Sequence, residues 1–438
     1  MARVTFIGAG SVIFTRMLVN DLLAFDELRD DYELVLHDID ERRLRVAGTA
    51  TRHVCEVRGA GARVRETLDR REALEGADYV IFTVQVGGHE ATVRDFEIPR
   101  RHGIRATIGD TLGIGGVFRA LRTFPVICET ARELAELSPN AWLLNYTNPM
   151  AMLCWSVYAG TPLERVVGLC HSVQGTAGKL ARLLGLEPAE IEYEVAGVNH
   201  LAFFLRLASV GGDDLYPRLA TAIAADPEGR GRTVRAELHR RLGYFVTESS
   251  EHAAEYVPWF LGDAEQHERF RIPLDEYVRR SAANLLEFER VAAAVGNGDG
   301  VGPPCGHEYA PRIVHALETG EPFRFNGNVR NDGLIDNLPA GACVEVPCTA
   351  DGDGIRPHPV GELPPQLAAL DRAYLAVCEL AVRAYVEGRR DWVYHACAVD
   401  PGVTGQGVSL ERIWAACDEL FEAHGELIPR ELRERAPV

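Results

Sequence analysis

Short apolar runs alternate with longer amphipathic stretches along the first half of the chain. The apolar runs predict buried strands at residues 3–7, 33–37, 78–84, 141–145, 165–169 and 192–198. Helical spacing of apolar residues marks 14–25 and 41–56, and a further helix is predicted to end at Ser138-Pro139. Strands that alternate with helices predict a mainly parallel, doubly wound sheet, so we expect an N-terminal Rossmann-like α/β domain.

The order of predicted elements changes after about residue 197. A strand is predicted at 201–208, helices follow, and a polar stretch rich in Gly, Pro and Asn runs from 296 to 337. Two amphipathic helices close the chain, at 364–385 and 410–423. We therefore divide the chain into a Rossmann-like domain at 1–195 and a mixed α+β domain at 196–438, which we expect to bind substrate and metal.

The composition is typical of a globular protein from a reducing compartment. The 438 residues are 47% apolar, and no apolar stretch is long enough to cross a bilayer. The N-terminus does not resemble a signal peptide, and the 10 Cys include no Cys-x-x-Cys pair, so we expect a cytoplasmic protein with free thiols. The net charge of −18 argues against nucleic acid or an acidic membrane as partner. We further expect a homo-oligomer, a dimer or a tetramer.

A glycine turn, Gly8-Ala9-Gly10-Ser11, separates the first predicted strand from the first predicted helix. Glycines at this point let backbone N–H groups approach a pyrophosphate at the helix N-terminus. Asp38 ends the second strand, where a carboxylate would bind the ribose diol and favour NAD over NADP, and Asp40 is the second choice. Ile13 stands where the fingerprint has its third glycine. The turn alone therefore also fits an ordinary strand–turn–helix or a 2-hydroxy acid dehydrogenase.

Three polar clusters follow predicted strands of the sheet. They are the stretch 145–149, the stretch Cys170-His171-Ser172 and the pair Asn199-His200. Ligands of open α/β sheets bind at the carboxyl ends of the strands, so we expect these clusters to converge on one crevice that faces the nicotinamide. A thiolate from Cys170 and an imidazole from His200 would bind a divalent transition metal and leave open positions for a substrate. The alternatives are a Cys in the core and a His that only makes hydrogen bonds.

Several sequence motifs occur in a fixed order along the chain. They are VTFIGAGSVIF, GDTLGIGGVFRALRT, NYTNPM, GLCHSVQGT and GVNH, and the segment GYFVTESSEHAAEYVPWF follows at 243–260. Together these motifs resemble glycoside hydrolase family 4. The resemblance covers the chain to about residue 200 and extends into its second half.

The resemblance implies a glycosidase that uses NAD and a divalent metal, commonly manganese. In that family NAD takes a hydride from C3 of the sugar, a base removes the acidified C2 proton, and the glycosidic oxygen leaves by elimination. Water then adds, and the hydride returns to C3. The metal stabilises the negative charge that develops on the sugar oxygens.

The resemblance also assigns roles to individual residues. Cys170 and His200 match the metal ligands, and Asn148 matches a substrate-binding position beside the nicotinamide. His171 stands at the position of the acid and of substrate recognition, and Asp110 is a further candidate for binding sugar hydroxyls.

The base that removes the C2 proton is a Tyr or an Asp in the family, and Tyr244 is the nearest match by position. A Tyr needs a lowered pKa for this role. A packed aromatic side chain remains the alternative for Tyr244.

The stretch after the metal-binding Cys differs between branches of the family. The branch that cleaves 6-phosphorylated sugars has Cys-Asn-x-Pro or Cys-Asp-x-Pro, whereas Cys170-His171-Ser172-Val173 resembles the α-galactosidase (melibiase) branch. We therefore expect an unphosphorylated α-galactoside as the small-molecule substrate. An α-galacturonidase or α-glucuronidase of the same family is the alternative, and a simple NAD-dependent sugar dehydrogenase is an alternative from another class.

Overall fold

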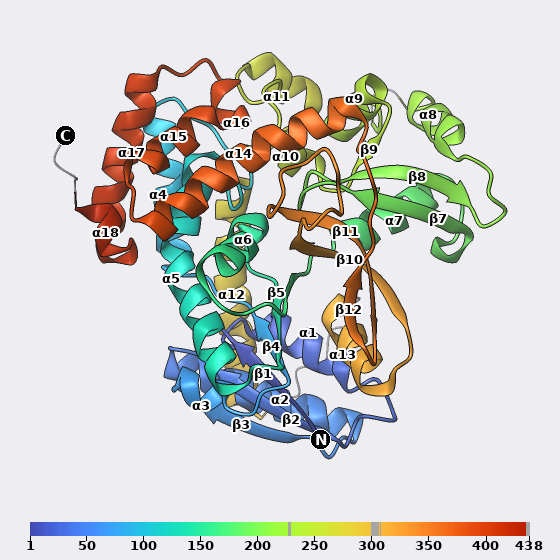
Figure 1. Cartoon of the computed structure of the whole chain (residues 1–438), viewed down its shortest axis with the longest axis vertical. Coiled ribbons are helices and arrows are strands. Elements are labelled where there is room, and N and C mark those ends of the chain that lie inside the picture. The colour runs from blue at the N-terminus through green and yellow to red at the C-terminus, as the bar shows by residue number, and fades with distance from the viewer. Residues whose placement is uncertain (227–228, 299–305, 307, 435–438) are drawn as a thin grey trace.

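The computed structural model describes residues 1–226, 229–298, 306 and 308–434. Two sheets organise these residues, a large sheet that contains the N-terminus and a small antiparallel sheet beside it (Figure 1). Helices from the C-terminal part cover the end of the molecule away from the N-terminus. No helix within the described residues is long and apolar enough to cross a membrane.

The large sheet has the strand order β12-β11-β10-β6-β5-β4-β1-β2-β3. Its parallel strands are β1 (Ala2–Ile7), β2 (Tyr32–His37), β3 (Arg63–Thr67), β4 (Tyr79–Phe82), β5 (Trp142–Asn145) and β6 (Val166–Gly168). The order 3-2-1-4-5-6 of these strands is that of a dinucleotide-binding sheet. The predicted Rossmann-like α/β fold is therefore confirmed.

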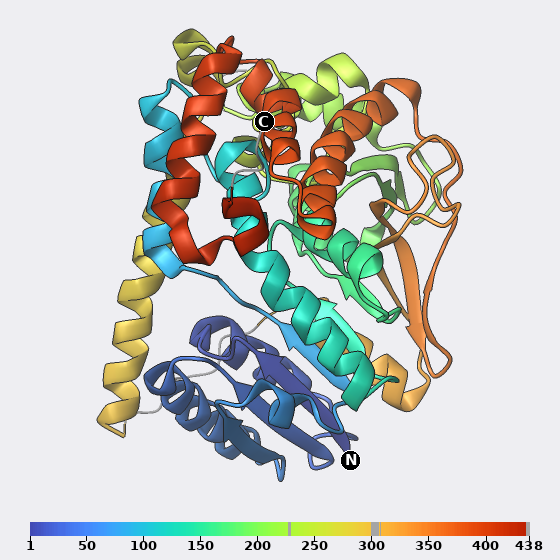
Figure 2. The ribbon, with the colours of Figure 1, turned by 60° about the vertical axis from the view of Figure 1, so that its left-hand side comes forward.

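Helices cover both faces of the parallel strands. The helices of the first half are α1 (Val12–Leu22), α2 (Glu41–Arg58), α3 (Arg70–Leu74), α4 (Gly88–Arg101), α5 (Gly113–Leu137), α6 (Met150–Gly160) and α7 (Ser172–Leu183). Helices α1 and α2 pack together, and α5 packs between α3 and α6. Figure 2 shows the blue helices and strands of the first residues together in the lower part of the molecule.

Three strands from the second half of the chain extend the large sheet. They are β10 (Phe323–Arg330), β11 (Cys343–Asp351) and β12 (Gly354–Pro357), and all three pair antiparallel. The polar stretch at 296–337 therefore contains β10, as well as the helix α13 (Tyr309–Thr319). The boundary at residue 195 remains a prediction, but the sheet itself is shared by both halves of the chain.

The small sheet has the order β7-β8-β9. Its strands are β7 (Ile191–Ala196), β8 (Phe203–Ser209) and β9 (Phe245–Val246). We expected residues 192–198 to belong to the parallel sheet, and this placement was wrong. The connection from β7 to β8 is too short for the crossover that a parallel pair needs, so the two strands pair antiparallel.

Helices of the second half connect and cover both sheets. They are α8 (Tyr216–Ala224), α9 (Val234–Leu242), α10 (Ser250–Ala253), α11 (Ala264–Phe270), α12 (Glu276–Gly296), α13, α14 (Pro365–Glu387), α15 (Asp391–Val399), α16 (Pro401–Thr404), α17 (Leu410–His424) and α18 (Arg430–Arg433). Helices α14 and α17 correspond to the two amphipathic helices expected near the C-terminus.

A buried ion pair ties the C-terminal helices to the first half of the chain. Arg122 on α5 donates through Nη1 to Oδ1 of Asp95 on α4 over 3.0 Å, and its Nη2 bonds the second carboxylate oxygen. Nε2 of His424 on α17 lies 2.9 Å from the same Oδ1. All three side chains are excluded from water. Asp95 therefore depends on these two partners for its charge to be tolerated.

We predict that Arg122→Leu strongly destabilises the protein, because it leaves Asp95 buried without its guanidinium. Removing one partner of a buried pair costs about 3–5 kcal/mol of unfolding free energy. Urea unfolding followed by circular dichroism measures this loss. Arg71→Leu is the matched control, since Arg71 makes a similar two-bond pair with Glu136 in solvent and should unfold like the parent protein. Equal unfolding midpoints for the two variants would contradict the prediction.

Candidate active site

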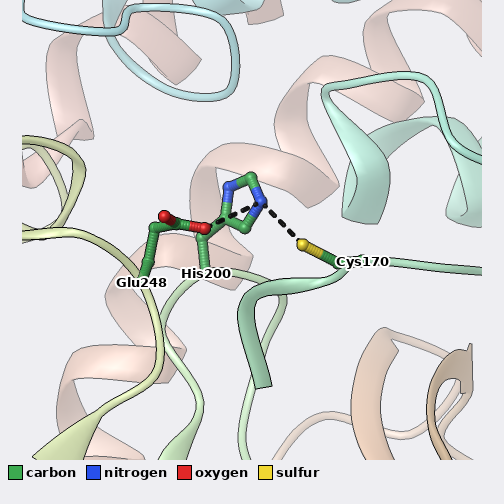
Figure 3. A group of neighbouring side chains, drawn as sticks. All are labelled: Cys170, His200 and Glu248. Atoms are coloured by element: carbon green, nitrogen blue, oxygen red, sulfur yellow. Dashed lines mark hydrogen bonds and ion pairs between the residues drawn. The ribbon is translucent and has the colours of Figure 1, made fainter. Parts of the chain in front are cut away.

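Three side chains with metal-binding atoms meet where the two sheets adjoin. Cys170 follows β6 of the large sheet, His200 lies in the turn between β7 and β8, and Glu248 follows β9. The Nε2 atom of His200 lies 3.3 Å from Sγ of Cys170 and 3.5 Å from Oε2 of Glu248. Figure 3 shows the imidazole between the thiol and the carboxylate. The crevice of the predicted metal site is thus formed by both sheets, not by the parallel sheet alone.

The turn that carries His200 is tight and conformationally unusual. His200 has a φ of 68°, in the left-handed region that few side chains other than Gly, Asn, Asp and His adopt. The N–H of Leu201 donates to the carbonyl of Val198 over 2.8 Å. A Cβ atom on Gly197 would lie 2.7 Å from Cα of Ala202, so only glycine fits there. This geometry directs the imidazole toward Cys170.

Backbone pairing fixes the distance between the two segments that carry Cys170 and His200. Four residues lie in a row across the strands, Gly168 opposite Asn328, Asn328 opposite Glu345, and Glu345 opposite Gly197. Gly197 and Glu345 exchange two backbone hydrogen bonds, of 3.1 and 2.8 Å. Cys170 comes shortly after one end of this row, and His200 shortly after the other.

Hydrogen bonds on the far side of the imidazole orient His200. Its Nδ1 atom lies 3.0 Å from the hydroxyl of Tyr256, and that hydroxyl lies 3.2 Å from Nε2 of His252. Nε2 of His252 is 3.3 Å from Oδ1 of Asp110. A His that binds a metal through Nε2 carries its proton on Nδ1, which then donates to the Tyr256 oxygen. The network is therefore of the kind that prepares a metal ligand.

Asp110 and Asn148, two of the predicted substrate-binding residues, contact each other in this network. Nδ2 of Asn148 donates to Oδ2 of Asp110 over 3.0 Å. Burial opposes the charge of Asp110, but the hydrogen bond and charge of His252, with Arg119 and His200 nearby, hold the pKa of this carboxyl below its usual range. The amide oxygen of Asn148 is buried and accepts no hydrogen bond within the described residues. It is free to bind a polar ligand group.

The loop before Asp110 is held by another carboxylate. Glu255 accepts hydrogen bonds from the backbone N–H groups of Thr107, Ile108 and Gly109. Glu255 is almost completely buried, and burial raises its pKa. This contact joins the segment around 250–256 to the loop that positions Asp110.

His171 and Tyr244 differ from the other predicted site residues in their surroundings. The side chain of His171 is 73% exposed, and its Nδ1 atom lies 3.5 Å from Oε1 of Glu308. It is adjacent to Cys170 and accessible from solvent. The ring of Tyr244 is half-buried and packs edge-on against Tyr216, with 6.3 Å between centroids. Within the described residues no hydrogen bond joins Tyr244 to Cys170 or His200, so its role as base remains a prediction.

The glycine turn has the shape that the predicted dinucleotide site requires. Gly8 has a φ of 90°, and a Cβ atom there would lie 2.6 Å from the carbonyl oxygen of Thr83. The N–H of Gly10 donates to Oδ2 of Asp38 over 2.7 Å. Ser11 is exposed before the first turn of α1 and makes no capping bond with its side chain. The first N–H groups of α1 therefore remain available to an anion.

Asp38 and Asp40, the two candidates for the ribose contact, have different surroundings. Asp38 lies directly after β2 and also accepts from the N–H of Asp40 over 2.9 Å. Asp40 instead accepts from the N–H of Arg43 and caps α2. The bond from Gly10 places Asp38 beside the glycine turn, whereas the capping bond directs Asp40 toward α2.

The side chains present fit both a divalent metal and a dinucleotide. Thiol, imidazole and carboxylate atoms of Cys170, His200 and Glu248 lie within 4.8 Å of one another, and these are donor types that transition metals bind. Burial, with Glu248 and Glu345 nearby, raises the pKa of the Cys170 thiol well above its usual value. A bound cation would supply the positive charge that a thiolate needs here.

Sequence reasoning missed several residues of this site. Glu248, His252 and Tyr256 all belong to the segment at 243–260, in which we had singled out only Tyr244. The signal was present as two acids and a His within a few residues after a short apolar run. Glu345 gave no signal, because it stands alone in a strand that we did not predict.

Glu345 is a buried carboxyl directly beneath the site. It is fully excluded from water, and neither of its oxygens accepts a hydrogen bond within the described residues. Burial raises its pKa to about 7, although His200 acts in the opposite direction. The folded protein therefore holds this proton more tightly than the unfolded chain does. The contribution of Glu345 to the unfolding free energy is therefore complete below the pKa that this carboxyl has in the unfolded chain. It is lost as the pH rises through about 7.

We predict that Glu345→Gln removes this pH dependence in metal-free protein. Between pH 5 and pH 8 the unfolding free energy of the parent should fall, relative to the variant, by on the order of 2 kcal/mol. Urea unfolding at several pH values measures the difference. Asp353→Asn is the control on the same hairpin, because Asp353 is 93% exposed and should leave the profile unchanged. A pH-independent difference between parent and Glu345→Gln would contradict the prediction.

Comparisons with known proteins agree with this site and fold. Residues 3–186 match the profile of the family 4 glycosyl hydrolases, and residues 195–403 match that of the family 4 glycosyl hydrolase C-terminal domain. An α-galactosidase from Bacillus subtilis (strain 168) is 42% identical over 433 residues, which cover 98% of this chain and 99% of the relative. An α-galactosidase from Rhizobium meliloti (strain 1021) is 34% identical over 449 residues, which cover 98% of this chain and 89% of the relative.

A solved structure has the same fold. The 6-phospho-β-glucosidase from Thermotoga maritima with manganese, NAD+ and glucose-6-phosphate superposes with a TM-score of 0.80 and 22% identity, over 97% of this chain and 99% of that one. The profile matches together extend over most of the sequence. The chain therefore belongs to family 4 of the glycosyl hydrolases.

Proposed function

We propose that this family 4 enzyme is an α-galactosidase that requires NAD and a divalent metal such as Mn²⁺ and acts on an unphosphorylated sugar. The observation that carries the proposal is the Sγ–Nε2 distance of 3.3 Å between Cys170 and His200, in a chain 42% identical to an α-galactosidase over nearly its full length. The distance and the identity support different parts of the proposal. The Cys170–His200 pair supports metal-dependent chemistry, and the α-galactosidase relatives support the galactoside substrate.

In this proposal the dinucleotide binds at the glycine turn. Gly8 and Gly10 leave room for the pyrophosphate, the N-terminus of α1 after Ser11 donates hydrogen bonds to it, and Asp38 binds the adenosine ribose. The carboxylate of Asp38 disfavours a 2′-phosphate and thereby NADP. A nicotinamide held there would supply a group that can accept a hydride from the sugar and give it back.

Cys170 and His200 would hold the metal, with Tyr256 fixing the protonation of His200. A metal held there would supply Lewis-acid chemistry to sugar oxygens beside it. Asn148 and Asp110 would orient sugar hydroxyl groups, since the Asn148 amide oxygen is still free to accept a hydrogen bond.

The two remaining assignments concern protons. His171 is exposed beside Cys170 and would donate a proton or a hydrogen bond toward the departing glycosidic oxygen. Tyr244 remains the proposed base for the C2 proton.

The substrate assignment depends on the stretch that follows β6. Cys170-His171-Ser172-Val173 stands where the phosphosugar branch has Cys-Asn-x-Pro or Cys-Asp-x-Pro. A site built for a 6-phosphate would bury cations that a neutral sugar leaves unpaired. A neutral hexose instead needs groups that bind hydroxyls, such as Asn148, His171 and Asp110.

We predict that hydrolysis requires NAD yet consumes none of it, because the hydride returns to the sugar in each cycle. Release of aryl alcohol and absorbance of NADH are measured together, with Mn²⁺ and a thiol reductant present. Product should accumulate while NADH does not. NADH that accumulates in proportion to product would overturn the glycosidase proposal and favour a sugar dehydrogenase.

We also predict that an aryl α-galactoside is the preferred substrate. Its kcat/KM should exceed that of its 6-phosphate by at least about 100-fold, because Cys170-His171-Ser172-Val173 lacks the pattern of the phosphosugar branch and a phosphate without matched cations binds poorly. The matching α-galacturonide is the third compound of the comparison. A preference for the 6-phosphate would contradict the assigned branch, and a preference for the uronide would make the enzyme an α-galacturonidase.

A further inference from the structure

Glu248 lies at the proposed metal site although nothing in the family resemblance assigns it a role there. Its Oε2 atom is 3.5 Å from Nε2 of His200, the same nitrogen that lies 3.3 Å from Sγ of Cys170 (Figure 3). The carboxylate reaches this position from β9 of the small sheet, so it belongs to a different chain segment from the other two groups.

The spacing of the three donor atoms fits one metal ion. Donors bound to a common ion at about 2.1–2.3 Å lie about 3–3.6 Å apart when they are neighbours in its coordination shell. The distances of 3.3 Å from Nε2 to Sγ and 3.5 Å from Nε2 to Oε2 fall within this span. All three donor atoms lie within 4.8 Å of one another, close enough for a single ion to contact each of them. Small side-chain adjustments would therefore suffice.

The other acids of the same segment are already engaged elsewhere. Glu251 accepts a hydrogen bond of 2.8 Å from Arg280, and Glu255 accepts three backbone N–H groups. Glu248 has His200 as its only ion-pair partner within the described residues, and its Oε1 accepts from the N–H of Ser249. The nearby guanidinium of Arg235 donates to Thr176 instead.

The side chain of Glu248 is only 19% exposed. A carboxylate so largely removed from water is costly without a cation beside it. A divalent ion between Glu248, His200 and Cys170 would supply that charge.

We propose that Glu248 is the third protein ligand of the divalent metal, an inference that rests on the proposed metal-dependent function. The thiolate and the carboxylate together balance the charge of the ion, so a neutral sugar can bind without further compensation. Three protein ligands leave up to three positions of an octahedral ion for substrate oxygens and water. The carboxylate also shifts the site toward harder ions such as Mn²⁺, which a thiolate and an imidazole alone would not favour.

Binding of Mn²⁺ to the full-length protein tests this assignment without any turnover. Electron paramagnetic resonance of free Mn²⁺ gives the Kd of the metal-free enzyme in the presence of NAD. We expect Glu248→Gln to raise the Kd by at least about 10-fold, and Glu248→Asp to recover part of the affinity. Glu251→Gln is the matched control, since Glu251 lies on the same segment at similar exposure and pairs with Arg280. Its Kd should match that of the parent. Circular dichroism spectra verify that each variant is folded.

The outcomes separate this inference from the function on which it rests. Cys170→Ser and His200→Ala should both weaken Mn²⁺ binding. A Glu248→Gln variant that binds Mn²⁺ as tightly as the parent would overturn the ligand assignment, even if it has lost activity. In that case the carboxylate acts on the substrate. If Cys170→Ser and His200→Ala also bind Mn²⁺ like the parent, the metal site is wrong and the proposed function falls with it.

Discussion

The backbone pairing between Gly197 and Glu345 is the constraint on which the active site depends. It joins the end of β7 in the small sheet to β11 in the large sheet through two hydrogen bonds. Strand β11 is in turn tied through β10 to β6, the strand that leads to Cys170. His200 comes only three residues after Gly197. The mainly parallel sheet and the small antiparallel sheet therefore bring the Cys170 thiol and the His200 imidazole together. A Cβ atom at position 197 would collide with Ala202, so this pairing requires glycine there.

The ionisable groups of the site fall into two sets, those whose charge the protein stabilises and those whose ionisation burial opposes. Asp110 accepts a hydrogen bond from Asn148, and the neighbouring His252, with Arg119 and His200, holds the pKa of its carboxyl low in spite of burial. Burial prevails around Cys170 and Glu345, whereas His200 and His252 hold the pKa of Glu248 below its usual range in spite of its burial. Burial raises the pKa values of the thiol and of Glu345, so these groups resist ionisation in the protein alone. A divalent cation beside Cys170 would favour the ionised thiolate. This gives a physical reason for a metal between Cys170 and His200 rather than beside Asp110.

Much of the fold followed from sequence patterns, and the exceptions have physical causes. The parallel strands and the glycine turn were predictable because buried strands leave continuous apolar runs. Strand β10 was not, because its inward positions include Asn326 and Asn328, whose side-chain amides donate to the backbone carbonyls of Val195 and Gly168. Strand β7 was recognised as a strand but placed in the wrong sheet, since periodicity does not reveal the pairing partner.

The site was predictable only where a motif marked it. Cys170, His200, Asn148 and Asp110 lie in motifs of the family, and the structure brings all four into one hydrogen-bonded region. Glu248 lies in the segment 243–260 but was overlooked there, whereas Glu345 reaches the same region through strand pairing between distant segments, which a single sequence does not display. Hydrolysis in D₂O tests the central claim, that the enzyme breaks and remakes the bond at C2, most directly. The account predicts that the released galactose carries deuterium at C2, detected by NMR. Galactose with its original hydrogen at C2 would show direct displacement at C1 and would contradict the account.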